Sequence, residues 1–454
     1  MNRFSFLVAS IILSTSAMAQ KVMTPELLWQ VKKVSPVGIT KDKKSLIYKV
    51  TSTDVSTQTD QTKTYLLSLA GGRASEIEDY KSLLVDKSLA DKTNYKVELE
   101  EVKLQKVFGK DFYPSMDLSD VQIYNELNYR HWDTWNNGNY EHLFVVNGND
   151  KVDVLGEEPY SVSEYVWAPD GNKVLYVSKK KFGTAYATST NTDIYEYNIQ
   201  TKETKNITEG KKGYDISPSF STLGDFAFLS MEHDGYEADK NDIIVRRGDL
   251  EVNLTKNWDG TVNSYLWSED GKKIYFNAPV GGTVQLFEVD VDFKSRKLPT
   301  VKQITKGEFD IASLNAITGT KAIVTKTDIN HAAEIYAIDL KSGKLSQLTN
   351  ENKAIFDTLA KSKVEARTIK TTDGKDMLAW VIYPPDFDPS KKYPTLLYCQ
   401  GGPQSALTQF YSTRCNRGKL LNFIHDAWCK IRLCFRTCFT CRIQCADCCI
   451  NGFT

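Results

Sequence analysis

Cysteine is missing from most of this chain of 454 residues. None occurs between residues 20 and 398, and eight of the nine cysteines follow residue 414, the ninth being Cys399. Disulfide bonds, which are common in exported proteins, therefore do not hold the main body together. Its stability must come from buried apolar cores, and a content of 41% hydrophobic and 25% charged residues is ordinary for such a globular chain.

Net charge and long apolar runs are also missing. The 57 Lys and Arg residues balance the 57 Asp and Glu residues, so nothing favours nucleic acid or an acidic polymer as a partner. No segment after residue 19 approaches the roughly 18 apolar residues of a membrane-spanning helix. We therefore expect neither a nucleic-acid partner nor a membrane partner for the mature chain.

The first 19 residues have the pattern of a secretory signal peptide. Arg3 supplies a positive charge, residues 4–13 form a short apolar core, and Ala17-Met18-Ala19 fits the small-x-small cleavage pattern. The sequence predicts cleavage after Ala19 and a periplasmic or secreted protein that begins at Gln20. The alternative, a buried N-terminal helix, stays open.

A strand–turn–strand motif recurs along the chain. Residues 165–176 and 265–275 both read Tyr-x-Trp, then a turn at Asp-Gly, then alternating apolar residues, and residues 217–228 are a weaker copy. A second motif ends in Ile-Thr or Leu-Thr, and its four threonines are 47, 50 and 44 residues apart, at Thr208, Thr255, Thr305 and Thr349. A period of about 45–50 residues with four strands per unit is the signature of a β-propeller.

These repeats predict the domain order. Residues 20–33 should be a helical segment that Thr24 caps, with Pro25 in the first turn. Residues 34–362 should form an all-β propeller of about seven blades. Two insertions interrupt the repeat, at residues 130–136 and 231–240, and both combine charged, aromatic and glycine residues as site-lining loops do. Solvated loops, or aromatics that brace a blade, are the alternative interpretation.

From residue 363 the period is lost. Residues 367–374 and 376–383 should form two strands, and residues 394–399 a buried strand that opens into Gln400-Gly401-Gly402-Pro403. Glycine backbones can approach a substrate carbonyl and turn an N–H toward it, as in the oxyanion hole of an α/β-hydrolase. Residues 363–412 therefore predict the first strands of an α/β-hydrolase domain that is not completed.

With these motifs in view, the chain resembles the prolyl oligopeptidase family of serine peptidases, notably its secreted dipeptidyl-peptidase V and acylaminoacyl peptidase members. The motifs that carry the resemblance are residues 130–135, 231–239, 371–374 and 394–403. The resemblance implies a propeller that limits access to a C-terminal hydrolase domain, short peptides as substrates, and neither cofactor nor metal.

The resemblance also assigns residues. The backbone N–H of Gly402 would be an oxyanion-hole donor, and Gly401 would allow the close approach of the substrate. Gln400 stands where the family usually has histidine. Within the insertion at 231–240, Glu237 and Asp239 would bind the free amine of the substrate, with Tyr236 beside them.

The catalytic triad is the main departure from the family pattern. The nucleophile motif Gly-x-Ser-x-Gly occurs nowhere in the 454 residues, and the only histidine after Pro403 is His425. The family's Ser, Asp and His triad is thus absent, so we expect this chain to be inactive. Its relatives' chemistry would be acyl transfer through serine.

The last 42 residues, 413–454, have a different composition. They are rich in cysteine and arginine, have no period, and are expected to be disordered. A frameshift near residue 412 is one explanation. A zinc site is the other, because Cys438-x-x-Cys441 and Cys445-x-x-Cys448 have ligand spacing, but the pairs lack the usual intervening loop.

Two functions remain from different classes. The parent protein could be a secreted serine exopeptidase, like a dipeptidyl- or acylaminoacyl-peptidase, or a non-catalytic periplasmic propeller that acts as a binding scaffold. Hydrolysis of dipeptidyl or aminoacyl reporter substrates by the chain distinguishes the two. The sequence does not predict the oligomeric state.

Overall fold

The computed structural model describes residues 22–295, 297, 299–398 and 406–411. The expected signal peptide, the glycines at 401 and 402, and the Cys-rich tail lie outside these residues. The first helix, α1 (Pro25–Gln30), begins as its sequence predicts. The Thr24 hydroxyl accepts a hydrogen bond from the Leu27 N–H at 3.3 Å, and Pro25 occupies the first turn.

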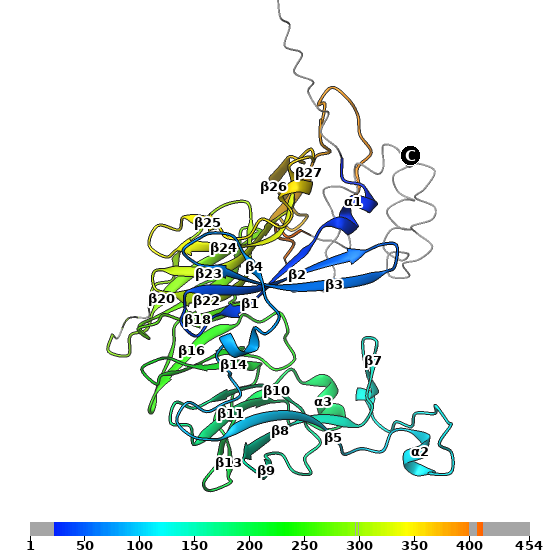
Figure 1. Cartoon of the computed structure of the whole chain (residues 1–454), viewed down its shortest axis with the longest axis vertical. Helices are drawn as coiled ribbons and strands as arrows, with labels where there is room; N and C mark the ends of the chain where they lie inside the picture. Colours follow the sequence, from blue (N-terminus) through cyan, green and yellow to red (C-terminus); the bar gives the residue numbers. More distant parts are fainter. Residues whose placement is uncertain (1–21, 296, 298, 399–405, 412–454) are drawn as a thin grey trace, which may run out of the picture.

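Most of the described chain forms antiparallel sheets that follow one another in sequence order (Figure 1). Sheet 1 contains β1 (Lys33–Ile39), β2 (Ser45–Asp54), β3 (Thr59–Ser68) and β4 (Ser75–Glu76). Sheet 2 contains β5 (Lys96–Lys103), β8 (Asn139–Asn147) and β9 (Asp150–Asp153). Sheet 3 contains β10 (Val162–Trp167), β11 (Lys173–Ser178), β12 (Asp193–Asn198) and β13 (Thr204–Asn206).

The next three sheets have four strands each. Sheet 4 contains β14 (Asp215–Phe220), β15 (Phe226–Ser230), β16 (Asp242–Arg247) and β17 (Leu250–Asn253). Sheet 5 contains β18 (Ser264–Trp267), β19 (Lys273–Val280), β20 (Thr283–Asp290) and β21 (Lys302–Gln303). Sheet 6 contains β22 (Asp310–Thr318), β23 (Lys321–Asp328), β24 (His331–Asp339) and β25 (Leu345–Gln347).

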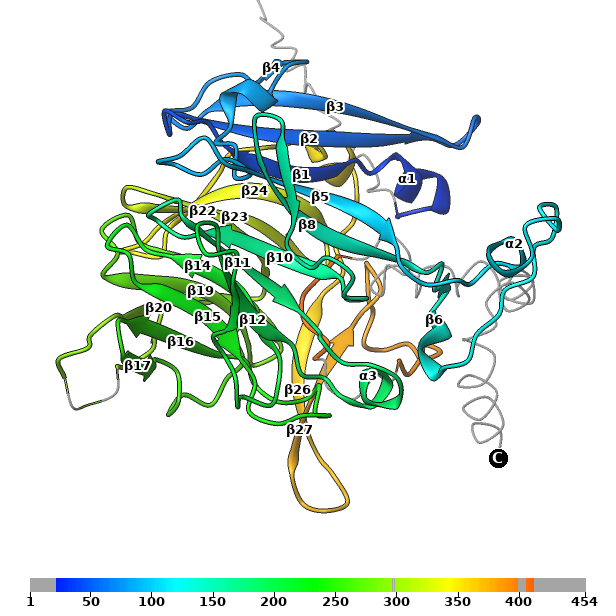
Figure 2. The same ribbon diagram turned by 90° about the horizontal axis from the view of Figure 1, so that it is seen from below.

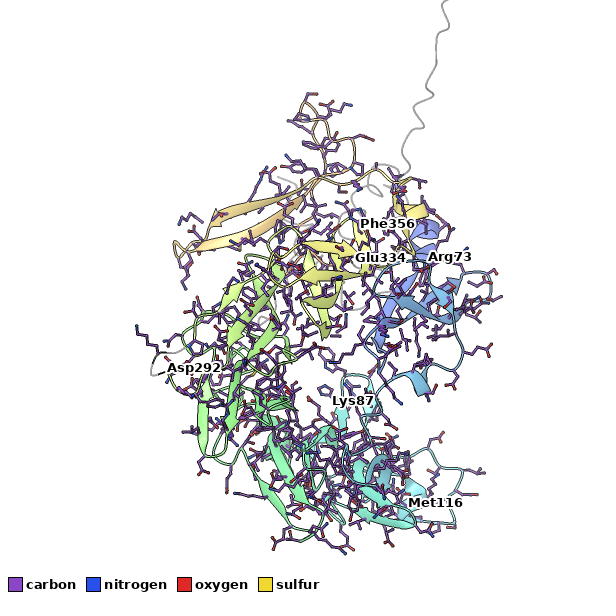
Figure 3. All side chains as sticks on the ribbon, turned by 60° about the vertical axis from the view of Figure 1, so that its left-hand side comes forward. Arg73, Lys87, Met116, Asp292, Glu334 and Phe356 are labelled. Carbon is purple, nitrogen blue, oxygen red and sulfur yellow. The ribbon has the colours of Figure 1, made fainter. Side chains whose placement is uncertain are left out.

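Apolar cores join these sheets face to face. Shared clusters of buried side chains connect sheets 2 and 3, 3 and 4, 4 and 5, and 5 and 6. A further cluster joins sheet 6 to sheet 1, where Ile323 and Ile335 meet Leu46 and Tyr48. Figure 3 shows this pair of neighbours, with the labelled Glu334 of sheet 6 on the side of sheet 1. Among the described residues, no such cluster joins sheet 1 to sheet 2.

The all-β repeat is therefore confirmed, but the described residues form six blade-like sheets of three or four strands rather than about seven, and apolar packing does not close them into a ring. The excursion between β5 and β8, residues 104–138, explains the overcount. It is nearly as long as a blade but forms only α2 (Gly109–Phe112), the 3₁₀ helix η2 (Leu127–Tyr129) and the two-residue strands β6 (Arg130–His131) and β7 (Thr134–Trp135). Figure 2 shows that it projects from the body.

The four periodic threonines have one structural role. Each is buried, its Oγ1 accepts a hydrogen bond from the backbone N–H of its sheet's third strand, and it donates to a side chain at the start of that strand. We call each group a threonine latch. In chain order the pairs are Thr208 with Asp193 (3.2 Å), Thr255 with Asp242 (2.7 Å), Thr305 with Gln285 (2.8 Å) and Thr349 with Glu334 (2.6 Å).

After sheet 6 come α4 (Lys353–Phe356) and a hairpin of β26 (Val364–Lys370) and β27 (Asp376–Ile382), which confirms the two strands expected there. The buried strand expected at 394–399 is wrong for its described part. Residues 394–398 are not in a strand, and Leu396, Leu397 and Tyr398 are 55%, 75% and 58% exposed. Among the described residues no neighbouring strand offers this segment a hydrogen-bonded edge. In the part of the chain described here, no helix is long and apolar enough to cross a membrane.

Candidate functional site

The two insertions meet on either side of α3 (Thr184–Thr188), which lies in the connection between β11 and β12. On one side α3 packs against η2, in the excursion from sheet 2. On the other side it adjoins the connection between β15 and β16, residues 231–241, which contains the second insertion. Figures 1 and 2 both place α3 beside the β6–β7 hairpin. The structure therefore brings the two predicted loops to one place.

Asp234 fixes the second insertion to sheet 3. Its Oδ1 atom accepts hydrogen bonds from Ser189 Oγ and the Thr190 N–H, both at 2.7 Å, and from the Asn191 N–H at 3.3 Å. Burial acts to raise the pKa of Asp234, but these three hydrogen bonds outweigh it and hold the pKa below its ordinary value. An ionised Asp234 thus anchors the loop.

Asp239 closes the same loop on itself. Its Oδ2 atom accepts a hydrogen bond from the His233 N–H at 2.7 Å and lies 2.8 Å from His233 Nδ1. The His233 ring meets the Tyr236 ring edge-on, with the centroids 5.7 Å apart. Of the two acids predicted to bind a substrate amine, Asp239 is therefore already engaged within the loop.

Glu237 is exposed and lies near the junction of sheets 3 and 4. Burial raises the pKa of Tyr214, just before β14, and the Glu237 charge adds to that rise. Burial lowers the pKa of the Lys179 ammonium, just after β11, while the carboxylates of Asp234 and Glu237 partly offset the effect. Glu237 thus acts electrostatically on groups from both sheets.

Aromatic rings line the same place. The Lys179 Nζ atom lies 4.5 Å from the centroid of the Tyr186 ring on α3, and Tyr236 is 62% exposed. A carboxylate beside aromatic faces suits an ammonium group, because the ring faces and the carboxylate both attract a cation. Tyr236 and Glu237 bring these two kinds of group together on one exposed loop.

One aromatic residue of the first insertion, Trp135, is packed against its neighbours. Trp135 packs with Tyr124 and Tyr129, with ring centroids 6.0 and 5.8 Å apart, and the Arg130 guanidinium lies 5.4 Å from the Trp135 ring. In these contacts Trp135 therefore braces the excursion itself rather than a blade. Trp132, by contrast, is 84% exposed.

The predicted site residues fall into two groups. Tyr236, Glu237 and Asp239 lie on one loop, whereas Gly401 and Gly402 lie outside the described residues. The sequence analysis did not identify Lys179, Tyr186 and Tyr214, although three consecutive lysines at 179–181 directly after a buried strand were a visible signal. No three His, Cys, Asp or Glu residues of the described chain are grouped to hold a metal ion, and the cysteines of the zinc alternative lie outside it.

Comparison with known proteins finds relatives that match most of the chain. No family model matches. The chain is 33% identical to dipeptidyl-peptidase 5 of Porphyromonas gingivalis, over 91% of this chain and 69% of that protein. It is 35% identical to dipeptidyl-peptidase 5 of Porphyromonas endodontalis, over 68% of this chain and 46% of that protein. The chain thus spans between about half and two thirds of these relatives' length.

A solved structure resembles the fold. An acylaminoacyl peptidase of Pyrococcus horikoshii superposes with a TM-score of 0.66 over 87% of this chain and 64% of that chain, at 17% sequence identity. At this identity the likeness concerns the fold alone.

Proposed function

Because the chain belongs to the prolyl oligopeptidase family of serine peptidases, we propose that it carries the substrate-selecting part of an exported serine exopeptidase, which removes short units from peptide N-termini. The observation that carries this proposal is the anchored loop at 231–241. Asp234 fixes it to sheet 3 and Asp239 folds it, so that the charge of Glu237 acts on Tyr214 and Lys179. We assign Glu237 to the free amine of the substrate.

The proposed chemistry is acyl transfer through a serine nucleophile, with the oxyanion held by the Gly402 N–H. Such a donor acts only together with a nucleophile and a base. The 454 residues contain no Gly-x-Ser-x-Gly motif, so we propose that this chain binds peptides without cleaving them. We also propose that the hydrolase segment begins near residue 363 and that the first 19 residues direct export.

The binding test uses a dipeptide amide with a free N-terminus and its N-acetylated form as probes, titrated into the chain by calorimetry. A charge-assisted hydrogen bond contributes about 1.5–3 kcal/mol, so Glu237→Gln should weaken binding of the free-amine probe roughly 10- to 100-fold. Glu232→Gln, an exposed acid in the same loop, is the matched control and should bind like the wild type.

The acetylated probe decides the assignment. It should bind wild type and Glu237→Gln alike, because it carries no ammonium group. If wild type binds both probes equally, Glu237 is not an amine anchor, and the exopeptidase proposal loses its support from this loop.

The second candidate is a non-catalytic binding scaffold, which the missing nucleophile motif favours for this chain. Reporter hydrolysis separates the two. Turnover of a dipeptidyl reporter that a serine-directed phosphonate blocks would contradict our expectation that the chain is inactive. The gene is first resequenced, and the protein that it encodes is then tested. If that protein binds peptides without turnover, the scaffold is favoured. N-terminal sequencing of exported protein tests the cleavage after Ala19.

A further inference from the structure

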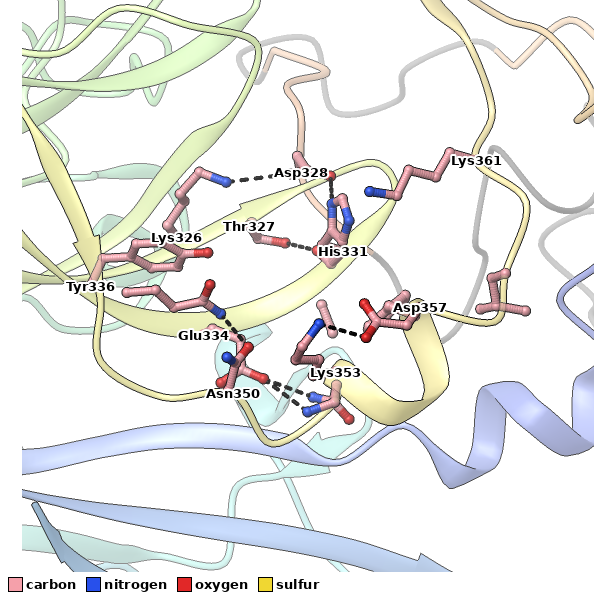
Figure 4. A pocket seen from close by; sticks show the side chains of 15 residues that line it. Lys326, Thr327, Asp328, His331, Glu334, Tyr336, Asn350, Lys353, Asp357 and Lys361 are labelled. Carbon is pink, nitrogen blue, oxygen red and sulfur yellow. Dashed lines mark hydrogen bonds and ion pairs between the residues drawn. The ribbon is translucent and has the colours of Figure 1, made fainter. Parts of the chain in front are cut away.

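A polar pocket of about 690 Å³ lies where sheet 6 passes into the following segment. The turn between β23 and β24, the outer strands of sheet 6, helix α4 and the linker after it form the walls (Figure 4). Its ionisable lining comprises Lys326, Asp328, His331, Glu334, Lys353 and Lys361, together with Asp357. Nothing in the proposed peptidase function uses these groups.

The carboxylates of the pocket already have partners. Asp328 Oδ1 lies 2.7 Å from His331 Nδ1 and accepts a hydrogen bond from the Asn330 N–H at 2.9 Å, while its Oδ2 lies 3.4 Å from Lys326 Nζ. Asp357 pairs with Lys353 at 2.5 Å. Glu334 belongs to the threonine latch of sheet 6. The acceptors of the pocket are therefore occupied from within the protein.

The donors are not all occupied. Among the described residues, Lys361 has no ion pair, and Figure 4 shows its side chain extended toward His331. The Nε2 atom of His331 likewise has no hydrogen bond to the described part of the chain. Both carboxylate oxygens of Glu334 already accept hydrogen bonds, from Thr349 Oγ1 and from the Asn352 N–H. The pocket therefore keeps two donors, on Lys361 and His331, that none of its described carboxylates satisfies.

The same turn holds the chain where it leaves and returns to sheet 6. The Asn330 side chain accepts a hydrogen bond from the Ser362 N–H and donates one to the Ser362 carbonyl, both at 2.9 Å. The Tyr411 N–H donates to Thr327 Oγ1 at 3.2 Å. Lys361 precedes Ser362, so one wall of the pocket is the linker itself.

We propose that this pocket binds a small oxyanion, a carboxylate or a phosphate, between Lys361 of the linker and His331 of the turn, and that the anion fixes the linker to sheet 6. The bound anion takes hydrogen bonds from the Lys361 ammonium and from His331 Nε2. For His331 to donate from both ring nitrogens it takes up one proton from solvent, and Asp328 on its other side stabilises the resulting imidazolium. The site is an effector site, because it acts on the link between two parts of the chain.

The first test measures binding of inorganic phosphate and, separately, of acetate to the full chain by calorimetry. Removing one of the two cationic donors should weaken phosphate binding about 10-fold or more, since charge-assisted hydrogen bonds are worth roughly 1.5–3 kcal/mol each. The variant is Lys361→Met, and the matched control is Lys341→Met, an exposed lysine in the turn between β24 and β25. The anion that binds with the higher affinity identifies the class of ligand.

The second donor is tested in the same way. His331→Gln, which cannot become cationic, should weaken phosphate binding about 10-fold. Equal phosphate affinity in wild type and Lys361→Met, or an equal loss in Lys341→Met, overturns the proposed site.

The second test measures hydrogen exchange at residues 360–364 with and without saturating phosphate. Phosphate should slow exchange several-fold in wild type and leave it unchanged in Lys361→Met. Circular dichroism checks that the variant is folded. Phosphate that binds without slowing exchange in the linker would contradict the effector role.

Discussion

Two of the connections between second and third strands contain or are flanked by an Asp–His pair, but they differ in length. In sheet 4 the connection runs over residues 231–241, and in sheet 6 only residues 329 and 330 separate β23 from β24. In the long loop the His233 and Asp239 side chains are 57% and 24% exposed. In the tight turn the His331 and Asp328 side chains are 39% and 18% exposed, and Lys326 joins them.

The difference shows how one residue pair takes on two roles. In the tight turn Asp328 also pairs with Lys326, whose Nζ atom lies 5.0 Å from the Phe309 ring and 5.3 Å from that of Tyr336. In the long loop the His233–Asp239 pair only folds the loop, and it thereby positions Glu237. We therefore expect substitutions in the turn to change stability, and substitutions in the loop to change ligand binding.

The largest effect on stability should come from Asp328→Asn. The substitution leaves the partly buried Lys326 and His331 without their carboxylate, which should lower the free energy of unfolding by about 2–3 kcal/mol. Asp239→Asn in the exposed loop should cost less than about 1 kcal/mol. Urea unfolding of both variants measures the difference. Equal losses of unfolding free energy in the two variants would contradict the expected difference between the turn and the loop.

The pH dependence of this effect has a definite sign. Burial acts to raise the pKa of Asp328, but the His331 hydrogen bond, its charge and that of Lys326 outweigh it and hold the pKa below its ordinary value. A carboxyl whose folded-state pKa is depressed contributes stability above its unfolded-state pKa and loses it as pH falls through the folded-state value. The gap in stability between wild type and Asp328→Asn should therefore shrink as the pH falls below about 4.

A smaller effect is expected from Asn330→Ala, which removes both hydrogen bonds to Ser362. Each such bond contributes about 0.5–1.5 kcal/mol, and the loss should be local to the linker. Hydrogen exchange at Ser362 should accelerate while the cores of sheets 2 to 5 keep their protection. Acceleration throughout the chain would mean that the turn supports the whole fold rather than the linker.

The smallest effect should come from Glu334→Gln. The latch of sheet 5 uses Gln285 in the same position and keeps the same hydrogen bonds, so a charge is not required there. Burial raises the pKa of Glu334, so its ionised form gains nothing from folding. We expect a change in unfolding free energy within about 1 kcal/mol. A larger loss would show that the carboxylate stabilises the turn beside it.

The repeat could be predicted from sequence because its signals are local. The strand–turn–strand copies around Trp167 and Trp267 fold as expected, since alternation and an Asp-Gly turn act within about ten residues. The threonine spacing identified the repeat unit. It did not indicate the latch, because the partners, such as Asp242 for Thr255, lie 13 to 20 residues earlier in each sheet.

The failures concern features that depend on distant neighbours. The apolar residues at 394–398 looked like a buried strand, but burial requires adjacent strands that the described residues do not supply. The blade count failed because residues 104–138 have the length of a blade without its pairing. For the site, the loop of Glu237 could be found from composition, whereas the engagement of Asp239 by His233 and the nearby Lys179 could not. The assignments to Gly401 and Gly402 stay predictions.

The core between sheets 1 and 6 also has a consequence for synthesis of the chain. Tyr48 bonds to Glu351 across 303 positions, and the Lys32 N–H bonds to Asn352 across 320. Sheets 2 to 5 each meet a neighbour that emerges next from the ribosome. At about 5–20 residues per second, sheet 1 waits roughly 15–60 s for its partner. We expect chaperones to bind the nascent chain at Leu46–Tyr48 throughout that interval.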